Sequence, residues 1–207
     1  MEGALRGSAG DVRLIETLLW DGARFPRLPL HLARLAAGAE RLGFPCDPAS
    51  VGRVLRAAVG ESPLRVRLTL GAGGDAEVTV AALPAAQAEW RLGLAAARLA
   101  SDDPWLRVKT TRRAAYDAAR AALPAGLDEV VFLNERGEVC DGTITTVFFD
   151  RGQGMRTPPL ACGLLPGVLR SELAVPEEVL LAEDLPRVRL WVGNALRGLI
   201  PAVWAGH

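Results

Sequence analysis

Two hydrophobic periods alternate along the first half of the chain. Residues 64–70, Leu-Arg-Val-Arg-Leu-Thr-Leu, place an apolar side chain at every second position, which is the pattern of a strand with one buried face. Between residues 30 and 42 the apolar positions follow helical spacing instead, and Gly43 then offers a stop. Asp47 followed by Pro48 predicts the N-cap and first turn of a second helix that runs to Val59.

The same reading extends to the whole chain. Strands are predicted at residues 12–20, 64–70, 77–83, 90–99, 129–133 and 138–150, and near Val179 and Leu190. Helices are predicted at residues 30–42, 47–59, 112–123 and 168–173. Turn sequences separate them at residues 21–22, 71–74, 134–137 and 151–154. This order predicts an α+β fold, mixed α and β, with largely antiparallel sheets.

A polar segment near the middle of the chain predicts two domains. Residues 84–108 include Pro84 and the stretch Ser101-Asp-Asp-Pro104, so we expect a small N-terminal α/β domain at 1–100 and a C-terminal domain at 101–207. With 207 residues, half of them hydrophobic, the chain can bury one large core or two small ones.

The amino-acid composition argues against several kinds of partner and binding site. Lys plus Arg and Asp plus Glu number 24 each, so no net field points to a nucleic acid partner. No apolar run is long enough to span a bilayer, and the first residues lack the apolar core of a signal peptide. Three cysteines without paired spacing are typical of reduced thiols, and two histidines argue against structural zinc. We therefore expect a cytoplasmic protein that does not bind membranes.

Lys109 is the only lysine in the chain, although the composition is rich in arginine. A deprotonated amine forms an imine with an aldehyde, whereas a guanidinium does not. Asp141 follows about thirty residues later in a segment that reads as a strand. A lysine that holds an aldehyde cofactor and an acid that keeps a pyridine nitrogen protonated are the two groups that pyridoxal phosphate chemistry needs.

Seven short motifs extend this pair across nearly the whole chain. They are Ile15-Glu-Thr-Leu18, His31-Leu-Ala-Arg-Leu35, Lys109-Thr-Thr-Arg-Arg113, Asp141-Gly-Thr-Ile-Thr-Thr-Val-Phe148, Thr157-Pro158, Leu165-Pro-Gly-Val-Leu-Arg170 and Gly193-Asn-Ala-Leu196. In kind and order they resemble the class IV aminotransferases, the fold-type IV pyridoxal phosphate enzymes. This family includes branched-chain and D-amino acid aminotransferases and aminodeoxychorismate lyases.

The resemblance implies a role for each matched residue. Lys109 would carry pyridoxal 5'-phosphate as a Schiff base and move the substrate's Cα proton. Asp141 would bind the pyridine nitrogen, at a position where the family usually has glutamate; the alternative is a residue of an Asp-Gly turn. Arg34 would bind the phosphate. Backbone donors at Gly167 and Val168, and a second loop at Asn194 and Ala195, would complete the phosphate site.

Two further arginines are candidates for the substrate carboxylate. Arg67 lies on the polar face of the strand at 64–70, where a solvated surface position is the alternative. Arg113 matches a position that is often arginine in the lyase branch, and Ala114 stands where branched-chain aminotransferases carry tyrosine. Tyr116, the only tyrosine, is expected to pack from the helix.

These features favour an aminodeoxychorismate lyase-like enzyme that releases pyruvate and 4-aminobenzoate. A class IV aminotransferase for branched-chain or D-amino acids is the alternative, because both activities share the core residues. A cofactor-binding relative without turnover also stays open, since Asp141, Thr146 and a short region before Glu16 depart from the family pattern. The resemblance further implies a homodimer, in which the neighbouring subunit completes the site.

Overall fold

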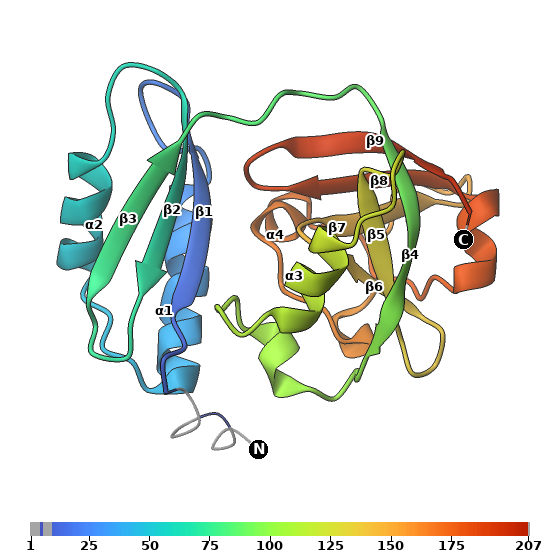
Figure 1. Ribbon diagram of the computed structural model, residues 1–207, viewed down its shortest axis with the longest axis horizontal. Helices are drawn as coiled ribbons and strands as arrows, with labels where there is room; N and C mark the ends of the chain where they lie inside the picture. The colour runs from blue at the N-terminus through green and yellow to red at the C-terminus, as the bar shows by residue number, and fades with distance from the viewer. Residues whose placement is uncertain (1–4, 6–9, 207) are drawn as a thin grey trace. The chain divides into compact units, whose positions relative to one another are not determined.

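The computed structural model describes residue 5 and residues 10–206, and its chain forms two compact units (Figure 1). The first unit contains the chain up to Ala85 together with Val108–Arg112, and the second contains Ala86–Arg107 and Arg113 onward. The division at Ala85 lies inside the predicted 84–108 segment but does not coincide with the predicted boundary between residues 100 and 101. The strand at 90–99 belongs to the second unit because its hydrogen-bonded neighbours are there.

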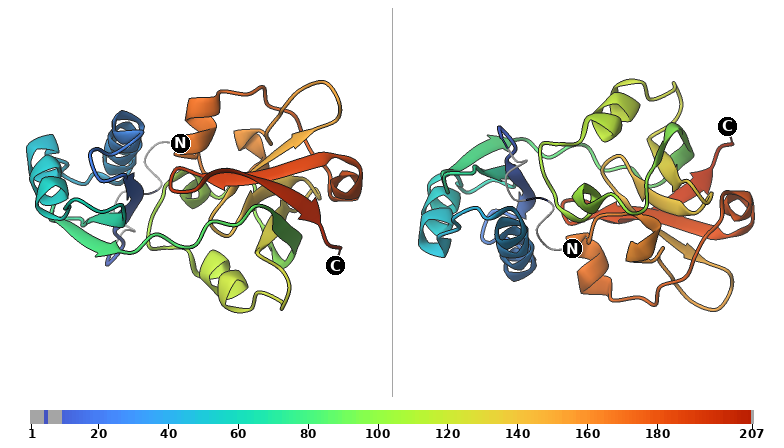
Figure 2. Two further views of the ribbon diagram at one scale, coloured as in Figure 1. Left: turned by 90° about the horizontal axis from the view of Figure 1, so that it is seen from above. Right: turned by 90° about the horizontal axis from the view of Figure 1, so that it is seen from below.

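The first unit is a three-stranded antiparallel sheet with two helices. Its elements are β1 (Leu14–Trp20), α1 (Leu28–Leu42), α2 (Pro48–Ala57), β2 (Leu64–Leu70) and β3 (Ala76–Ala81). The strands pair in the order β1-β2-β3, α1 packs against β1, and α2 packs against β3. Both helices lie on the same side of the sheet (Figure 2).

Alternation along the strands decides which residues face these helices. Leu18 pairs with Val66 and Leu14 pairs with Leu70, and all four side chains are buried. A methyl group added at Gly38 of α1 would meet the Leu14 side chain at 2.8 Å, so this face of β1 lies against α1. The predicted strand at 64–70 is confirmed.

The predicted helix boundaries of the first unit are confirmed at the caps. Asp47 accepts hydrogen bonds from the backbone N–H groups of Ala49 and Ser50. Gly43 ends α1 in the left-handed conformation, with φ of 73°. The second helix ends at Ala57, two residues before the predicted end.

The second unit is a closed six-stranded barrel. Its strands are β4 (Trp90–Leu99), β5 (Glu129–Asn134), β6 (Val139–Gly142), β7 (Thr146–Asp150), β8 (Arg189–Asn194) and β9 (Gly198–Trp204), hydrogen-bonded in that order. Its helices are η1 (Pro104–Arg107), α3 (Ala114–Ala121), η2 (Leu160–Cys162), α4 (Val168–Leu173) and η3 (Ala182–Arg187). Strand β4 runs parallel to β5 and β9, and the other pairs are antiparallel, as largely predicted.

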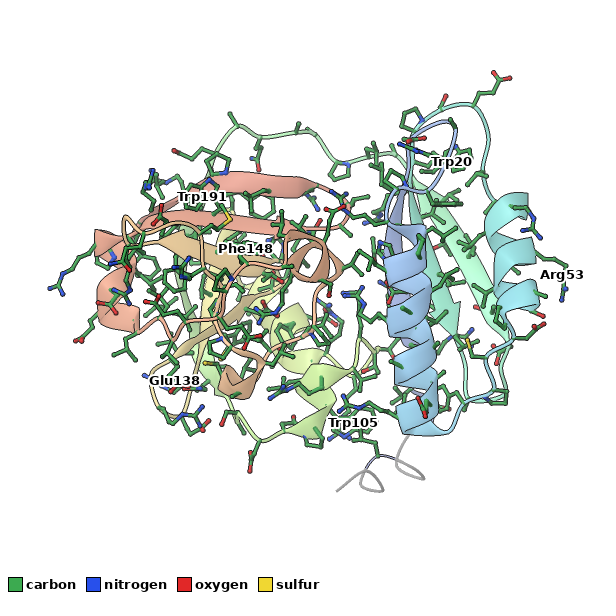
Figure 3. The ribbon with its side chains drawn as sticks, turned by 180° about the vertical axis from the view of Figure 1, so that it is seen from behind. Trp20, Arg53, Trp105, Glu138, Phe148 and Trp191 are labelled. Carbon is green, nitrogen blue, oxygen red and sulfur yellow. The ribbon has the colours of Figure 1, made fainter. Side chains whose placement is uncertain are left out.

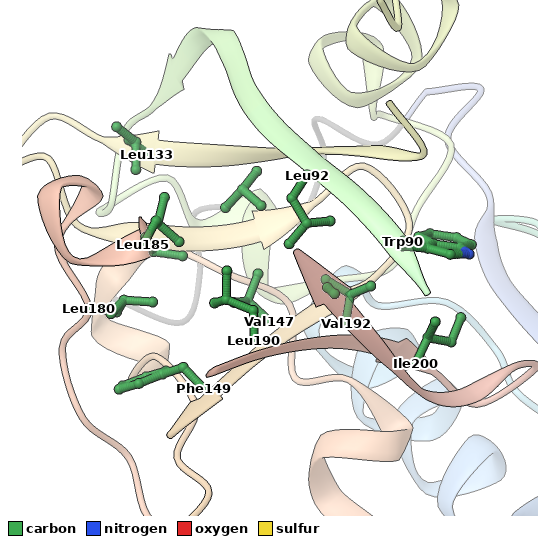
Figure 4. Packing of buried hydrophobic residues seen from close by; sticks show 13 residues of the cluster. Trp90, Leu92, Leu133, Val147, Phe149, Leu180, Leu185, Leu190, Val192 and Ile200 are labelled. Atoms are coloured by element: carbon green, nitrogen blue, oxygen red, sulfur yellow. The ribbon is translucent and has the colours of Figure 1, made fainter. Parts of the chain in front are cut away.

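Aliphatic and aromatic side chains from the barrel strands meet in one buried cluster (Figure 4). Leu92, Val147 and Val192 in this cluster have no exposed surface. Leu180 and Leu185, which lie outside the strands, are equally buried there. The packing of this cluster holds the barrel strands in place, and candidate site residues lie at the ends of these strands.

Several predicted elements of this half are corrected. The expected strand at 138–150 is two strands, β6 and β7, because the chain reverses between Gly142 and Thr146. Around Val179 there is an isolated bridge from Leu181 rather than a strand. The helix expected at 112–123 spans only the residues of α3, because the backbone of Arg113 is not helical.

Strand β9 was not predicted. It contains Pro201, which lacks the N–H that a central strand donates, so the local sequence is not typical of a strand. Strand β4 pairs with β9 only from Ala202 onward, after the proline. All three cysteines are free thiols. Among the described residues, no helix is long and apolar enough to cross a membrane.

Candidate functional site

The residues selected from the sequence are distributed over both units. Arg34, Arg67 and Lys109 lie in the first unit, and Arg113, Asp141, Gly167, Val168, Asn194 and Ala195 lie in the second. Each set is described within its own unit.

Lys109 lies in a short segment bonded to the edge of β1. Its carbonyl oxygen accepts a hydrogen bond from Ile15 N at 2.9 Å, and Thr111 N donates to Arg13 O at 2.9 Å. The backbone on both sides of the lysine is thereby paired as in a strand, and Thr110 between the two contacts is buried. The half-buried Lys109 side chain therefore projects from a fixed backbone, which a covalent cofactor link requires.

Arg34 on α1 forms a forked ion pair with Glu16 of β1. Its Nε and Nη2 donate to the two carboxylate oxygens of Glu16 at 2.8 and 2.7 Å. His31, one turn earlier on α1, is bonded through Nδ1 to Glu16 Oε2 at 2.6 Å. Because an ionised carboxylate only accepts, Nδ1 is the donor in this bond. Glu16 thus fixes the orientation of the arginine guanidinium relative to the sheet.

Glu16 remains charged although it is buried. Burial raises its pKa, but the charge and hydrogen bonds of Arg34, together with those of His31, outweigh this effect and leave the pKa lower than its ordinary value of 4.5. Glu16 and His31 belong to two separate sequence motifs, from which no contact between them was predicted. The structure shows that the two motifs pair with each other.

Arg67 lies on the face of the sheet opposite α1. In the register of the sheet it stands beside Thr17 of β1 and Thr79 of β3, and its side chain is half-buried. Neighbours Val66 and Leu68 point to the helix-covered face. The arginine is therefore on the polar face, as the alternation predicted.

Asp141 lies in β6 and is 6 % exposed. Its Oδ2 accepts a hydrogen bond from Leu165 N at 3.1 Å, which connects β6 to the loop before α4. Tyr116 of α3 packs edge-on against Phe132, as expected for a packing residue. Burial there, with a contribution from the negative charge of Asp141, raises the pKa of Tyr116. The Asp141 side chain thus extends from β6, where it is bonded by Leu165 and lies near Tyr116.

Arg113 and Asn194 both bind the turn that follows Asp141. Arg113 Nη2 donates to Thr143 O at 3.0 Å, and its Nε donates to Asp117 at 2.7 Å. Asn194 Nδ2 donates to Ile144 O at 3.1 Å. Asn194 Oδ1 also accepts from the N–H groups at 196 and 197, which shapes its own loop. The sequence selected these residues separately, and the structure brings them to one turn.

Gly167 and Val168 begin α4 next to β7. A Cβ at Gly167 would lie 2.7 Å from Thr146 Oγ1, so only glycine allows this close approach. The buried Arg170 holds the helix, since its Nη1 donates to Thr157 Oγ1 at 2.8 Å and to Pro158 O at 2.7 Å. Through these bonds the Thr157-Pro158 motif is in direct contact with the motif that contains α4.

The loop after β8 is close to α4. A Cβ at Gly193 would meet Leu169 of α4 at 2.6 Å and Gly198 O at 2.6 Å, and Ala195 in the same loop is buried. Thr146 of β7 is the register partner of both Asp141 and Gly193. Phe148, further along β7, is fully buried (Figure 3). Asp141, the start of α4 and the Asn194 loop therefore surround one end of β7.

Glu129, the first residue of β5, was not selected from the sequence. It has no exposed surface, and it accepts hydrogen bonds from residues of the turn that follows Asp141. In the sequence, a single glutamate ahead of an apolar run is typical of a solvent-exposed residue at the start of a strand. The sequence therefore carried no signal that would have distinguished it.

Comparisons with known proteins agree on one family. Residues 13–203 match the family model described as "Amino-transferase class IV". A protein of Schizosaccharomyces pombe named "Putative aminodeoxychorismate lyase" is 33% identical over 167 residues, covering 77% of this chain and 72% of that protein.

Two solved structures extend the similarity. The structure titled as a putative amino-acid aminotransferase from Mesorhizobium loti is 45% identical, with a TM-score of 0.90, covering 94% of this chain and all of that one. The 4-amino-4-deoxychorismate lyase from Pseudomonas aeruginosa is 25% identical, with a TM-score of 0.81, covering 97% of this chain and 85% of that one.

Proposed function

Because the chain belongs to the class IV aminotransferase family and is an enzyme of that family, we propose that it is a pyridoxal 5'-phosphate-dependent lyase. Its substrate would be aminodeoxychorismate, and its products pyruvate and 4-aminobenzoate. The observation that carries this proposal is the 33% identity, over 77% of the chain, to a protein named for the lyase. The Pseudomonas aeruginosa lyase adds support at the level of the fold and sequence.

The residues of the barrel fit a phosphorylated pyridine. Asp141 offers a buried carboxylate, the acceptor that a protonated ring nitrogen needs, and Leu165 N fixes its orientation. Gly167 permits a close backbone approach at the start of α4, where N–H groups suit phosphate oxygens. Asn194 and Ala195 would add the second phosphate loop. Arg34 belongs to the first unit, and the family resemblance alone implies that it would bind the phosphate; Glu16 orients its guanidinium.

When bound, the cofactor withdraws electrons from the Cα of an amino substrate. Lys109 would carry the cofactor through Nζ and then take the Cα proton as a general base. For that task the amine must lose its own proton, and Asp141 must keep its negative charge. Arg67 and Arg113 would orient substrate carboxylates, since guanidinium groups match carboxylates in geometry and charge.

An amino-acid aminotransferase is the second candidate. It is favoured by the 45% identity to the Mesorhizobium loti protein, which is named for that activity; the match covers 94% of this chain and all of that one. The two candidates differ in what the enzyme needs for a second turnover. A lyase needs no second substrate for its next turnover, whereas an aminotransferase needs a keto acid to accept the amino group.

This difference gives the test. We expect purified enzyme with aminodeoxychorismate to release pyruvate over many turnovers in the absence of 2-oxoglutarate, measured by a coupled lactate dehydrogenase assay. Addition of 2-oxoglutarate should leave the rate unchanged. Turnover that stops after one equivalent and resumes only with a keto acid would replace the lyase by the aminotransferase.

A further inference from the structure

The turn between β6 and β7 is held mainly by side chains. Among the residues that the structure describes, the register between these strands consists of the single pair Asp141 and Thr146. The turn itself closes through one backbone bond, Gly142 N to Thr145 O at 2.8 Å. On its other side β6 pairs with β5, and Leu165 N bonds the Asp141 side chain, but neither contact reaches residues 143–145 of the turn. Other contacts must determine how this turn lies.

Glu129 supplies those contacts from beneath the turn. Its Oε1 accepts from Thr143 Oγ1 at 2.6 Å. Its Oε2 accepts from Thr145 Oγ1 at 3.0 Å and from Ile144 N at 3.2 Å. Three consecutive residues of the turn thus donate to one carboxylate. The two oxygens of one side chain therefore accept bonds from every residue between Gly142 and Thr146.

The space around this carboxylate is tightly filled. A Cβ at Gly142 would lie 2.8 Å from Glu129 Oε2 and 2.4 Å from Thr145 Oγ1. Arg120 of α3 provides the nearest opposite charge, with Nη1 3.6 Å from Glu129 Oε1. Because Glu129 is fully buried and this space is filled, a change at its carboxyl group acts directly on the turn.

From this arrangement we infer that Glu129 is a positioning residue, which holds residues 143–145 so that Asp141 presents its carboxylate to the cofactor ring. The inference rests on the proposed role of Asp141. Glu129 acts through the turn, and Arg113 and Asn194 hold the same turn through the carbonyl oxygens of Thr143 and Ile144. Any change that frees the turn should therefore weaken cofactor binding without unfolding the barrel.

Glu129→Gln is the direct test, because it keeps the shape and removes the charge. Whichever way the amide is oriented, one carboxylate oxygen becomes an NH₂ group that cannot accept from the turn. Glu138→Gln is the matched control, since Glu138 lies just before the other end of β6 and bonds Arg136 and Asn134 there (Figure 3).

Two measurements separate positioning from general stability. Hydrogen exchange of the cofactor-free protein should show faster exchange in the peptide spanning 139–149 for Glu129→Gln, with the other barrel strands unchanged. Titration of the apoprotein with pyridoxal phosphate, followed by absorbance, should give a dissociation constant weakened by about tenfold, the scale of losing one hydrogen bond to a buried charge. Glu138→Gln should show the hydrogen-exchange rates of wild type at residues 142–146 and the same dissociation constant for pyridoxal phosphate.

A second pair of variants applies if Glu129→Gln does not fold. Thr145→Val removes one hydroxyl donor at nearly constant volume, and Thr145→Ser keeps it. We expect Thr145→Val to weaken cofactor binding and Thr145→Ser to resemble wild type. If Glu129→Gln, or Thr145→Val in its place, binds cofactor as tightly as wild type with unchanged exchange, the inference is wrong while the proposed function stands. If wild-type protein binds no pyridoxal phosphate, both fail together.

Discussion

Asp141 is a buried acidic residue of β6, and the proposed function gives its carboxyl group a role beside the pyridine nitrogen. We predict that Asp141→Asn leaves the fold intact, because the amide oxygen still accepts the bond from Leu165 N. The neutral amide cannot stabilise a protonated pyridine nitrogen, and kcat should fall by about a hundredfold, the scale of removing one preorganised electrostatic partner. Thermal unfolding and steady-state kinetics measure the two effects.

Asp150 offers a matched control for this substitution. It is a buried aspartate of the same barrel, at the end of β7, and its Oδ1 likewise accepts backbone N–H groups. Asp150→Asn should keep the turnover rate of wild type. Normal turnover by Asp141→Asn would show that another group serves the ring nitrogen.

At the scale of elements, the β1–α1 contact depends on a buried charge. The pKa of Glu16 is lower in the folded protein than its ordinary value of 4.5, so folding is stabilised above that value by the ionised form. This stability should be lost as the pH falls from 4.5 through the lower pKa of the folded state. Glu16→Gln removes this stabilisation at all pH values, because Arg34 then has no carboxylate at position 16 to pair with.

We therefore expect Glu16→Gln to lower the free energy of unfolding by about 3 kcal/mol at pH 7, the scale of breaking a buried ion pair. The difference from wild type should shrink below pH 4.5, as measured by urea unfolding at several pH values. Glu61→Gln, at an exposed glutamate of the same unit, should change little at any pH. A difference for Glu16→Gln that stays constant down to pH 2 would contradict the assignment.

Elements with a clear period could be predicted from the sequence, and elements set by tertiary contacts could not. The strand at 64–70 and the cap at Asp47 follow from local pattern and capping chemistry. The reversal after Gly142 depends on Glu129, thirteen residues earlier and fully buried, which no local pattern reveals. The motif series could select Arg113 and Asn194, but only the fold shows that both bind one turn.

For the whole molecule, the homodimer stays a prediction drawn from the resemblance. One chain has a mass of 22.0 kDa, and we expect sedimentation equilibrium of the cofactor-saturated protein to give twice that mass. Dilution that produces monomers should release the cofactor, because a neighbouring subunit would complete the site. A monomer that still binds pyridoxal phosphate tightly would contradict this prediction.

The central claim is that Lys109 carries pyridoxal phosphate, and the composition makes it unusually easy to test. Lys109 is the only lysine in the chain. We predict that borohydride reduction of cofactor-saturated protein attaches one pyridoxyl phosphate group, which peptide mass mapping finds on the peptide containing Lys109. Lys109→Arg keeps the positive charge but should remain unlabelled, because a guanidinium forms no stable imine. Wild-type protein that stays unlabelled, or a label retained in Lys109→Arg, would contradict the account.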